Sequence, residues 1–181
     1  YSDWFFNRIR EGFVLVRNPM NFHQVSKIDL SPEVVDCIVF WSKDPRPMLS
    51  RLSELDKYIF YFQFTLTSYD KTIEANVPEK QYLIKTFREL STQIGSDKVI
   101  WRYDPILLTD KYDVKYHVKW FEYLAAKLSG YTKRCVISFI DMYRKTERNL
   151  KGIHLIPMNE EVINKIAYYL SLIAKKYDLE L

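Results

Sequence analysis

The alternation of apolar and polar residues is most regular over residues 58–67, where it predicts a β-strand. Phenylalanines such as Phe62 and Phe64 fall on one face of this strand, and Gln63 and Thr65 fall on the other. An aromatic face suits packing beneath helices, and a mixed polar face suits the interior of a small barrel. An open doubly wound sheet would instead favour apolar residues on both faces of so central a strand. The pattern therefore favours a barrel.

Other apolar runs predict a series of strands separated by helices. Further strands are expected over residues 13–16, 37–41, 99–104, 135–140 and 153–156. Helices are expected over about 2–11, 47–55, 78–94, 113–128 and 159–177, with a single helical turn near 31–33. Residues 20–30 are predicted to form a loop or an irregular crossover.

Glycines and prolines indicate how these elements are connected. The four glycines lie in connections that lead into strands, and four prolines lie just after strands: Gly12, Gly95, Gly130, Gly152, Pro19, Pro45, Pro105 and Pro157. This order predicts parallel strands with helical crossovers. The glycine-rich phosphate turn of a dinucleotide-binding fold is missing from the sequence. We therefore predict an α/β fold, a partial (β/α) TIM-like barrel with about six parallel strands, as one domain over residues 1–181. Because a complete barrel has eight strands, we expect the chain to be a fragment that is incomplete at one or both ends.

Composition narrows the class of protein without fixing its partner. The sequence is 48% hydrophobic and 16% aromatic, which predicts a packed globule. A net charge of +4 permits a phosphate-bearing or acidic partner but does not require one. Cys37 and Cys135 lie in strand-like runs and are expected to be buried, reduced thiols, which suggests a cytoplasmic protein. No apolar run is long enough for a membrane span, so no membrane partner is expected.

The candidate site lies where the predicted strands end. Residues 99–108 begin with the predicted strand over 99–104, whose last positions on one face are Arg102 and Asp104, and Pro105 then ends the ladder. In barrels of this kind the carboxyl ends of the strands form the active site. The candidate catalytic residues are Arg102, Asp104, Asp141 and Lys43, and the candidate substrate-binding residues are Arg17, Asn18, Gln63 and Thr65. Forked guanidinium donors suit a small polar or anionic substrate, and the carboxylates suit acid–base chemistry.

Other interpretations of these residues stay open. Strand ends are polar in most proteins, so the set could be solvated loop starts. Tyrosines and tryptophans in a mildly basic chain would also suit a non-catalytic or nucleic-acid-associated binding module, although most fall at core periodicity. Asp104 and Asp141 could together hold the metal of a hydrolase. His117 lies within a predicted helix and is expected to be structural.

Several segments taken together resemble a bacterial family known as domain of unknown function 1848. They are FVLVRNP at 13–19, VDCIVFWSKDP at 35–45, YFQFTLT at 61–67, VIWRYDPI at 99–106 and CVISFIDMY at 135–143. The resemblance covers essentially the whole chain and brings no established activity. Matching positions that it supports as pocket residues are Arg17, Asn18, Lys43, Gln63, Arg102, Asp104 and Asp141.

The resemblance also implies that longer members of the family have parts that this sequence lacks. These are a further strand before the position of Tyr1 and a cysteine-rich tail similar to that of radical S-adenosylmethionine enzymes. Thiolates at such spacing can hold an iron–sulfur cluster. The resemblance thus implies an iron–sulfur cluster and S-adenosylmethionine in the full-length protein, and neither cofactor within this chain.

Overall fold

The computed structural model describes the backbone of residues 1–181 and the side chains of all of them except Lys145 and Asn149. The chain divides into two compact units. The first comprises Tyr1–Phe40 and Pro45–Tyr61, and the second comprises Trp41–Asp44 and Phe62–Leu181.

The first unit begins with the predicted helix, α1 (Ser2–Glu11), followed by an antiparallel hairpin of β1 (Phe13–Arg17) and β2 (Val25–Asp29). Gly12 ends the helix in the left-handed region at φ 73°, where a residue without Cβ is favoured. The prediction that residues 20–30 form only a loop was wrong, and so was the prediction that the first strand is parallel to its neighbour. The reason is a tight return at residues 18–24, where the Asn18 N–H donates to the Gln24 carbonyl over 3.0 Å.

The first unit also contains a ten-residue 3-10 helix, η1 (Arg46–Leu55), where a helix was predicted. Its buried residues are Leu49, Leu52 and Leu55, which are spaced three apart. In a 3-10 helix such residues align on one face, so this spacing suits the tighter winding. The single turn predicted near 31–33 is a hydrogen-bonded turn, in which Ser31 accepts from Val34 and Val35.

A four-stranded sheet has the order β3 (Ile38–Ser42), β4 (Phe60–Thr65), β5 (Val99–Ile106) and β6 (Cys135–Phe139). β4 is parallel to β5, with Thr65 opposite Arg102, and β5 is parallel to β6, with Arg102 opposite Val136. The alternation of strands and helices in the sequence therefore identified a parallel α/β fold correctly. The number of parallel strands was overestimated, because the hairpin is antiparallel and residues 153–156 do not form a strand.

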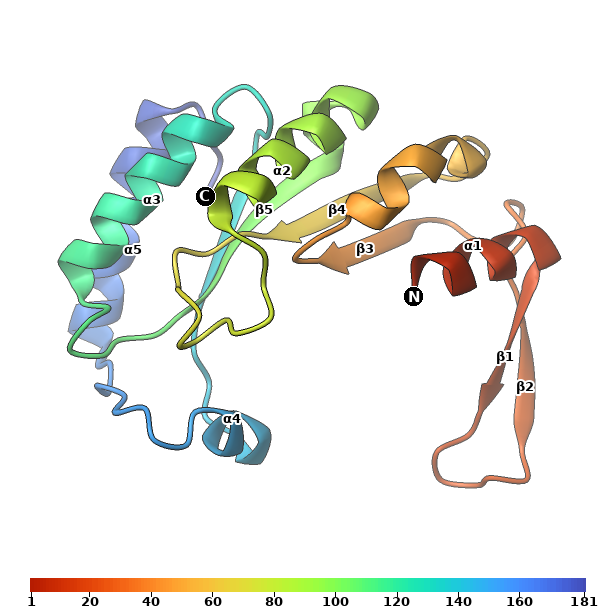
Figure 1. Ribbon diagram of the computed structural model, residues 1–181, viewed down its shortest axis with the longest axis horizontal. Helices are drawn as coiled ribbons and strands as arrows, with labels where there is room; N and C mark the ends of the chain where they lie inside the picture. The colour runs from red at the N-terminus through yellow and green to blue at the C-terminus, as the bar shows by residue number, and fades with distance from the viewer. The chain divides into compact units, whose positions relative to one another are not determined.

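The helices of the second unit are α2 (Lys80–Ile94), α3 (Val114–Leu128), α4 (Arg144–Asn149) and α5 (Glu160–Lys176), with a short 3-10 turn, η2 (Ser96–Lys98), before β5. α3 and α5 pack side by side (Figure 1). Phe64 of β4 contacts Phe87 of α2 with ring centroids 5.0 Å apart, and Trp101 of β5 stacks on Phe121 of α3 at 4.8 Å. The aromatic face of the strands thus lies beneath helices, as the alternation predicted.

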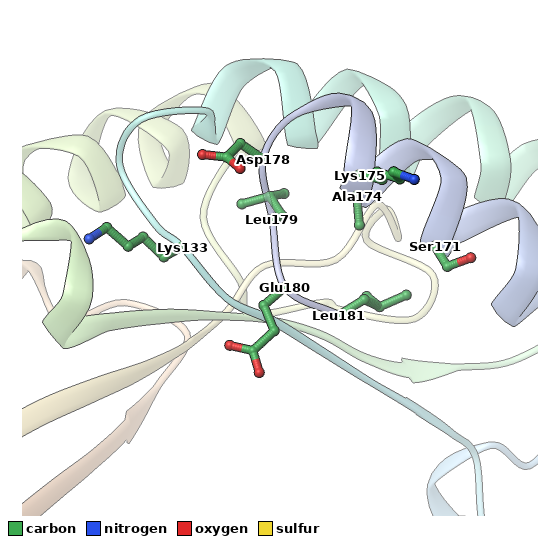
Figure 2. A pocket seen from close by; sticks show the side chains of 8 residues that line it. All are labelled: Lys133, Ser171, Ala174, Lys175, Asp178, Leu179, Glu180 and Leu181. Atoms are coloured by element: carbon green, nitrogen blue, oxygen red, sulfur yellow. The ribbon is translucent and has the colours of Figure 1, made fainter.

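After α5 the chain returns to the edge of the sheet. Glu180 forms a parallel bridge with Arg134, and the Cys135 N–H donates to the Glu180 carbonyl over 2.7 Å. Figure 2 shows Glu180 and Leu181 at the end of this return, beside a cavity of about 480 Å³. None of the candidate site residues lines this cavity. In the described chain no helix combines the length and apolar character that crossing a membrane requires.

Candidate functional site

The candidate site is built on β5, whose two faces differ in chemistry. Val99, Trp101 and Tyr103 are buried on the side of the strand that packs beneath helices. Arg102 and Asp104 alternate with them and keep 13% and 14% of their side-chain surface exposed. A charged pair at this depth is stable only when its hydrogen-bonding groups have partners.

Arg102 donates most of the hydrogen bonds around this pair. Its Nε donates to Asp104 Oδ2 over 2.8 Å, its Nη2 donates to the same oxygen, and its Nη1 donates to Gln63 Oε1 over 2.6 Å. Ser138 of β6 donates its hydroxyl hydrogen to Asp104 Oδ1. Trp41 covers the guanidinium, with its ring centroid 4.2 Å from Arg102 Cζ. We call Arg102, Asp104, Gln63, Ser138 and Trp41 the Arg102 cluster.

Arg102 has more N–H groups than its described hydrogen bonds use. A guanidinium has five N–H groups, and the bonds to Asp104 and Gln63 use three of them. Two N–H groups therefore have no acceptor among the described residues. Trp41, which covers the guanidinium, is 65% exposed, and Arg102 keeps 13% of its side-chain surface exposed. The arrangement can bind an oxygen of a carboxylate, phosphate or carbonyl group.

Asp104 has fewer unused hydrogen-bonding positions than Arg102. Its Oδ2 accepts twice from Arg102 and its Oδ1 accepts from Ser138. A carboxylate has about four acceptor positions, so one position on Oδ1 stays available for a metal ion or a substrate proton. Because its other positions are used by Arg102 and Ser138, Asp104 mainly holds Arg102 in place.

Lys43, at the end of β3, has a different partner. Its ammonium pairs with Glu74, and Lys80 of α2 pairs with the other oxygen of the same carboxylate. Glu74 keeps only 7% of its side-chain surface exposed. Burial raises the pKa of Glu74, but the charges and hydrogen bonds of Lys43 and Lys80 outweigh burial and hold that pKa below its ordinary value. We call Lys43, Glu74 and Lys80 the Glu74 cluster.

Two other predicted residues of the second unit, Thr65 and Asp141, have no contact with the Arg102 cluster among the described hydrogen bonds and ion pairs. Thr65 is buried opposite Arg102 in the ladder, and Asp141 is exposed two residues beyond β6. Arg17 and Asn18 belong to the hairpin of the first unit. Thr67, which follows β4, has a buried Oγ1 without a hydrogen-bond partner among the described residues. Such an atom is rare in folded proteins and is usually satisfied by water or a ligand.

His117 is structural, as predicted. It is fully buried, and its Nε2 lies 2.9 Å from the Leu107 carbonyl, which can only accept, so Nε2 carries the proton. Nδ1 then accepts from the Tyr103 hydroxyl over 2.9 Å. Burial lowers the pKa of His117 and raises that of Tyr103, so both groups are neutral at physiological pH.

The two cysteines differ from each other, and only Cys37 differs from the prediction. Cys135 is buried, and burial raises the pKa of its thiol. Cys37 is exposed because it lies in the connection just before β3 rather than within the strand. Within the described side chains, no three His, Cys, Asp or Glu residues gather closely enough to hold a metal ion. The residues present therefore do not fit an iron–sulfur cluster.

Sequence reasoning missed Glu74 and Lys80. Both lie in or next to the connection between β4 and α2, where charged residues ordinarily face solvent. The spacing of residues 68–80 gives no sign that the loop brings a carboxylate back to Lys43. The alternation within β4 and β5, by contrast, does place Gln63 and Arg102 on neighbouring strands.

Comparison with known proteins identifies the family. Residues 1–181 match the family model described as "Domain of unknown function (DUF1848)". The chain belongs to this family. Among curated proteins, none matches the DUF1848 chain.

A solved structure shares the fold of the DUF1848 chain. It is "Spore photoproduct lyase complexed with dinucleoside spore photoproduct", with a TM-score of 0.56 and 12% sequence identity. The similarity covers 77% of the DUF1848 chain and 48% of the lyase chain, so the chain spans about half the length of that structure. At this identity the likeness shows the fold alone.

Proposed function

We propose that this DUF1848 chain is the sheet-bearing part of an enzyme of radical S-adenosylmethionine type, in which the Arg102 cluster binds a small polar or anionic substrate. The observation that carries the proposal is the pair of Arg102 N–H groups that remain after Asp104 and Gln63 are satisfied. The resemblance of longer family members to radical S-adenosylmethionine enzymes supplies the enzyme class. The likeness of fold to a lyase agrees with an enzymatic role.

The role of each residue follows from its contacts. Asp104 and Gln63 hold the guanidinium in one orientation, which reduces the entropy lost when a ligand binds. Trp41 covers the flat face of Arg102, so a ligand reaches the edge of the guanidinium rather than its face. Thr65 and Asp141 stay candidates for further substrate contacts within the second unit, and Arg17 and Asn18 stay separate candidates on the hairpin of the first unit.

The iron–sulfur cluster and S-adenosylmethionine are part of the proposal only for the full-length enzyme. Because the described residues do not fit an iron–sulfur cluster, no chemical step is assigned to this chain. Anaerobic reconstitution of a full-length DUF1848 protein with iron and sulfide should give iron–sulfur absorption. A protein that stays colourless would contradict the radical S-adenosylmethionine class, and the proposed binding site would then be tested separately.

Binding is tested on the 181-residue chain by calorimetry with succinate and with its neutral analogue succinamide. Succinate should bind more tightly than succinamide, and Arg102→Lys should weaken succinate binding about tenfold, because lysine keeps the charge but loses the fork. Arg134→Lys is the matched control, since Arg134 also donates from Nε and Nη2 to one carboxylate oxygen, that of Glu180. Equal losses in the two variants, or equal affinity for the two compounds, would contradict the proposal.

The nucleic-acid interpretation is tested in the same preparation. A single-stranded oligonucleotide at low salt should not compete with succinate, because binding through phosphates requires several cations. Competition that weakens steeply with salt would favour a nucleic-acid-associated module.

A further inference from the structure

The second unit contains a cavity that none of the Arg102 cluster lines. It has a volume of about 350 Å³ and lies between the β4–α2 connection and α3. Residues from both elements line it, among them Ser68, Glu74, Lys80, Tyr116 and Trp120. The volume falls in the range of small-molecule sites. Shape alone does not identify a ligand, so its chemistry has to come from the walls.

One wall is aromatic. Tyr116 and Trp120 are four residues apart on α3, and their ring centroids are 6.0 Å apart. The Tyr116 hydroxyl donates to the Ser68 carbonyl over 2.7 Å, which holds this ring against the β4–α2 connection. Trp120 is half-buried, and its indole N–H has no acceptor in the part of the chain that the structure describes. This wall suits a planar ring that stacks and offers an acceptor to the indole N–H.

The charged residues that line the cavity are three lysines and three carboxylates, and a further cation, Lys43, pairs with Glu74 from outside the lining. Two other ion pairs at the cavity balance one to one, Lys111 with Asp70 and Lys71 with Glu79. The Glu74 cluster does not balance, because Lys43 and Lys80 share a single carboxylate. Lys80 lines the cavity with a fifth of its side chain exposed, and its ammonium has donors beyond the one used by Glu74. The unused donors of Lys80, together with the extra cation behind Glu74, suit an anion.

We propose that the cavity is a second ligand site, which binds a planar aromatic ring carrying an anionic group. The ring lies against Trp120 and Tyr116, and the anion lies at Lys80. An aromatic carboxylate and a nucleotide share this chemistry. The proposal is independent of the Arg102 cluster, because the residues that line the cavity include no member of that cluster.

The experiment is an NMR titration of the ¹⁵N-labelled 181-residue chain, followed at the indole N–H signals of its four tryptophans. Benzoate and adenosine 5′-monophosphate are the two probes. Cyclohexanecarboxylate keeps the charge of benzoate without a planar ring, and benzamide keeps the ring without the charge. Trp41 reports on the Arg102 cluster and Trp120 reports on the cavity, so the two sites are read separately.

Benzoate should shift the Trp120 signal more strongly than either analogue at the same concentration. A shift with benzoate and not the nucleotide assigns an aromatic carboxylate, and the reverse assigns a nucleotide. Lys80→Gln should weaken the bound probe about tenfold, as loss of a charge-assisted contact does. Lys119→Gln, which removes an exposed lysine next to Trp120 in the sequence, should leave the affinity unchanged.

Two results would overturn the proposal. One is a Trp120 signal that responds to neither probe, and the other is a response to cyclohexanecarboxylate or benzamide as large as that to the probe that binds. If Lys80→Gln perturbs the fold, the conservative variant Lys80→Arg keeps the test valid, because it retains the cation and should retain binding. A shift confined to Trp41 would contradict the cavity site and leave the proposed Arg102 site intact.

Discussion

Two arginine–carboxylate pairs in the second unit have the same bonding pattern in different surroundings. Arg102 and Arg134 each donate from Nε and Nη2 to a single carboxylate oxygen, of Asp104 and of Glu180. The first pair is 13% and 14% exposed and has Gln63, Ser138 and Trp41 around it. The second pair is 54% and 67% exposed. The comparison shows that a pair of this geometry becomes a candidate site through burial and additional partners, not through the ion pair itself.

The largest effect is expected at Glu74, the most buried carboxylate of the ion pairs compared here. Glu74→Gln leaves Lys43 and Lys80 without their anion and should lower the free energy of unfolding by about 3 kcal/mol, measured by urea denaturation at pH 7. This loss of stability is at the low end of the range for breaking a buried ion pair, because Lys43 is 43% exposed and can be rehydrated.

The pH dependence of that loss checks its cause. The pKa of Glu74 is lowered in the folded state, so its contribution is complete above the ordinary glutamate pKa and is lost as pH falls through the lowered value. The gap between wild type and Glu74→Gln should therefore narrow below about pH 4. A gap that is the same in acid and at neutral pH would show that the ion pairs are not its origin.

A smaller effect is expected at Asp104. Asp104→Asn keeps the shape of the side chain and removes the charge that faces Arg102, which should cost about 2 kcal/mol in the same denaturation experiment. The loss should persist in 0.5 M salt, because a mostly buried pair is poorly screened. A loss that disappears with added salt would place this pair in the same class as Arg134–Glu180.

The smallest effect is expected at the exposed pair. Glu180→Gln should change the free energy of unfolding by about 0.5 kcal/mol or less, because both charges stay hydrated when the pair is broken. The backbone bond from Cys135 to Glu180 is unaffected by this substitution. A loss as large as that of Asp104→Asn would mean that burial does not separate the two pairs.

The sequence predicted the parts of the fold that follow from local periodicity. The faces of β4 and β5 were predicted correctly because strict alternation separates Phe64 and Trp101 from Gln63 and Arg102. The hairpin was missed because all five residues of β2 are exposed, so this strand has no buried face for the sequence to show. Its pairing depends on backbone bonds to β1, which any residue except proline can make.

The candidate site, like the fold, was predictable where it follows from the periodicity of neighbouring strands. Contact between Arg102 and Gln63 follows from two neighbouring parallel strands. The partner of Lys43 could not be predicted, because Glu74 reaches it through the path of a long connection rather than through a strand or helix period. Loop paths depend on tertiary packing, and a single sequence contains little information on them.

The central claim is that Arg102 keeps two N–H groups for an anionic ligand. A crystal structure of the 181-residue chain grown with succinate tests it most directly. The account predicts a carboxylate oxygen within hydrogen-bond distance of Arg102 Nη1 or Nη2, with the bonds to Asp104 and Gln63 intact. Succinate bound elsewhere, or an Arg102 whose remaining N–H groups are taken by the protein itself, would contradict it.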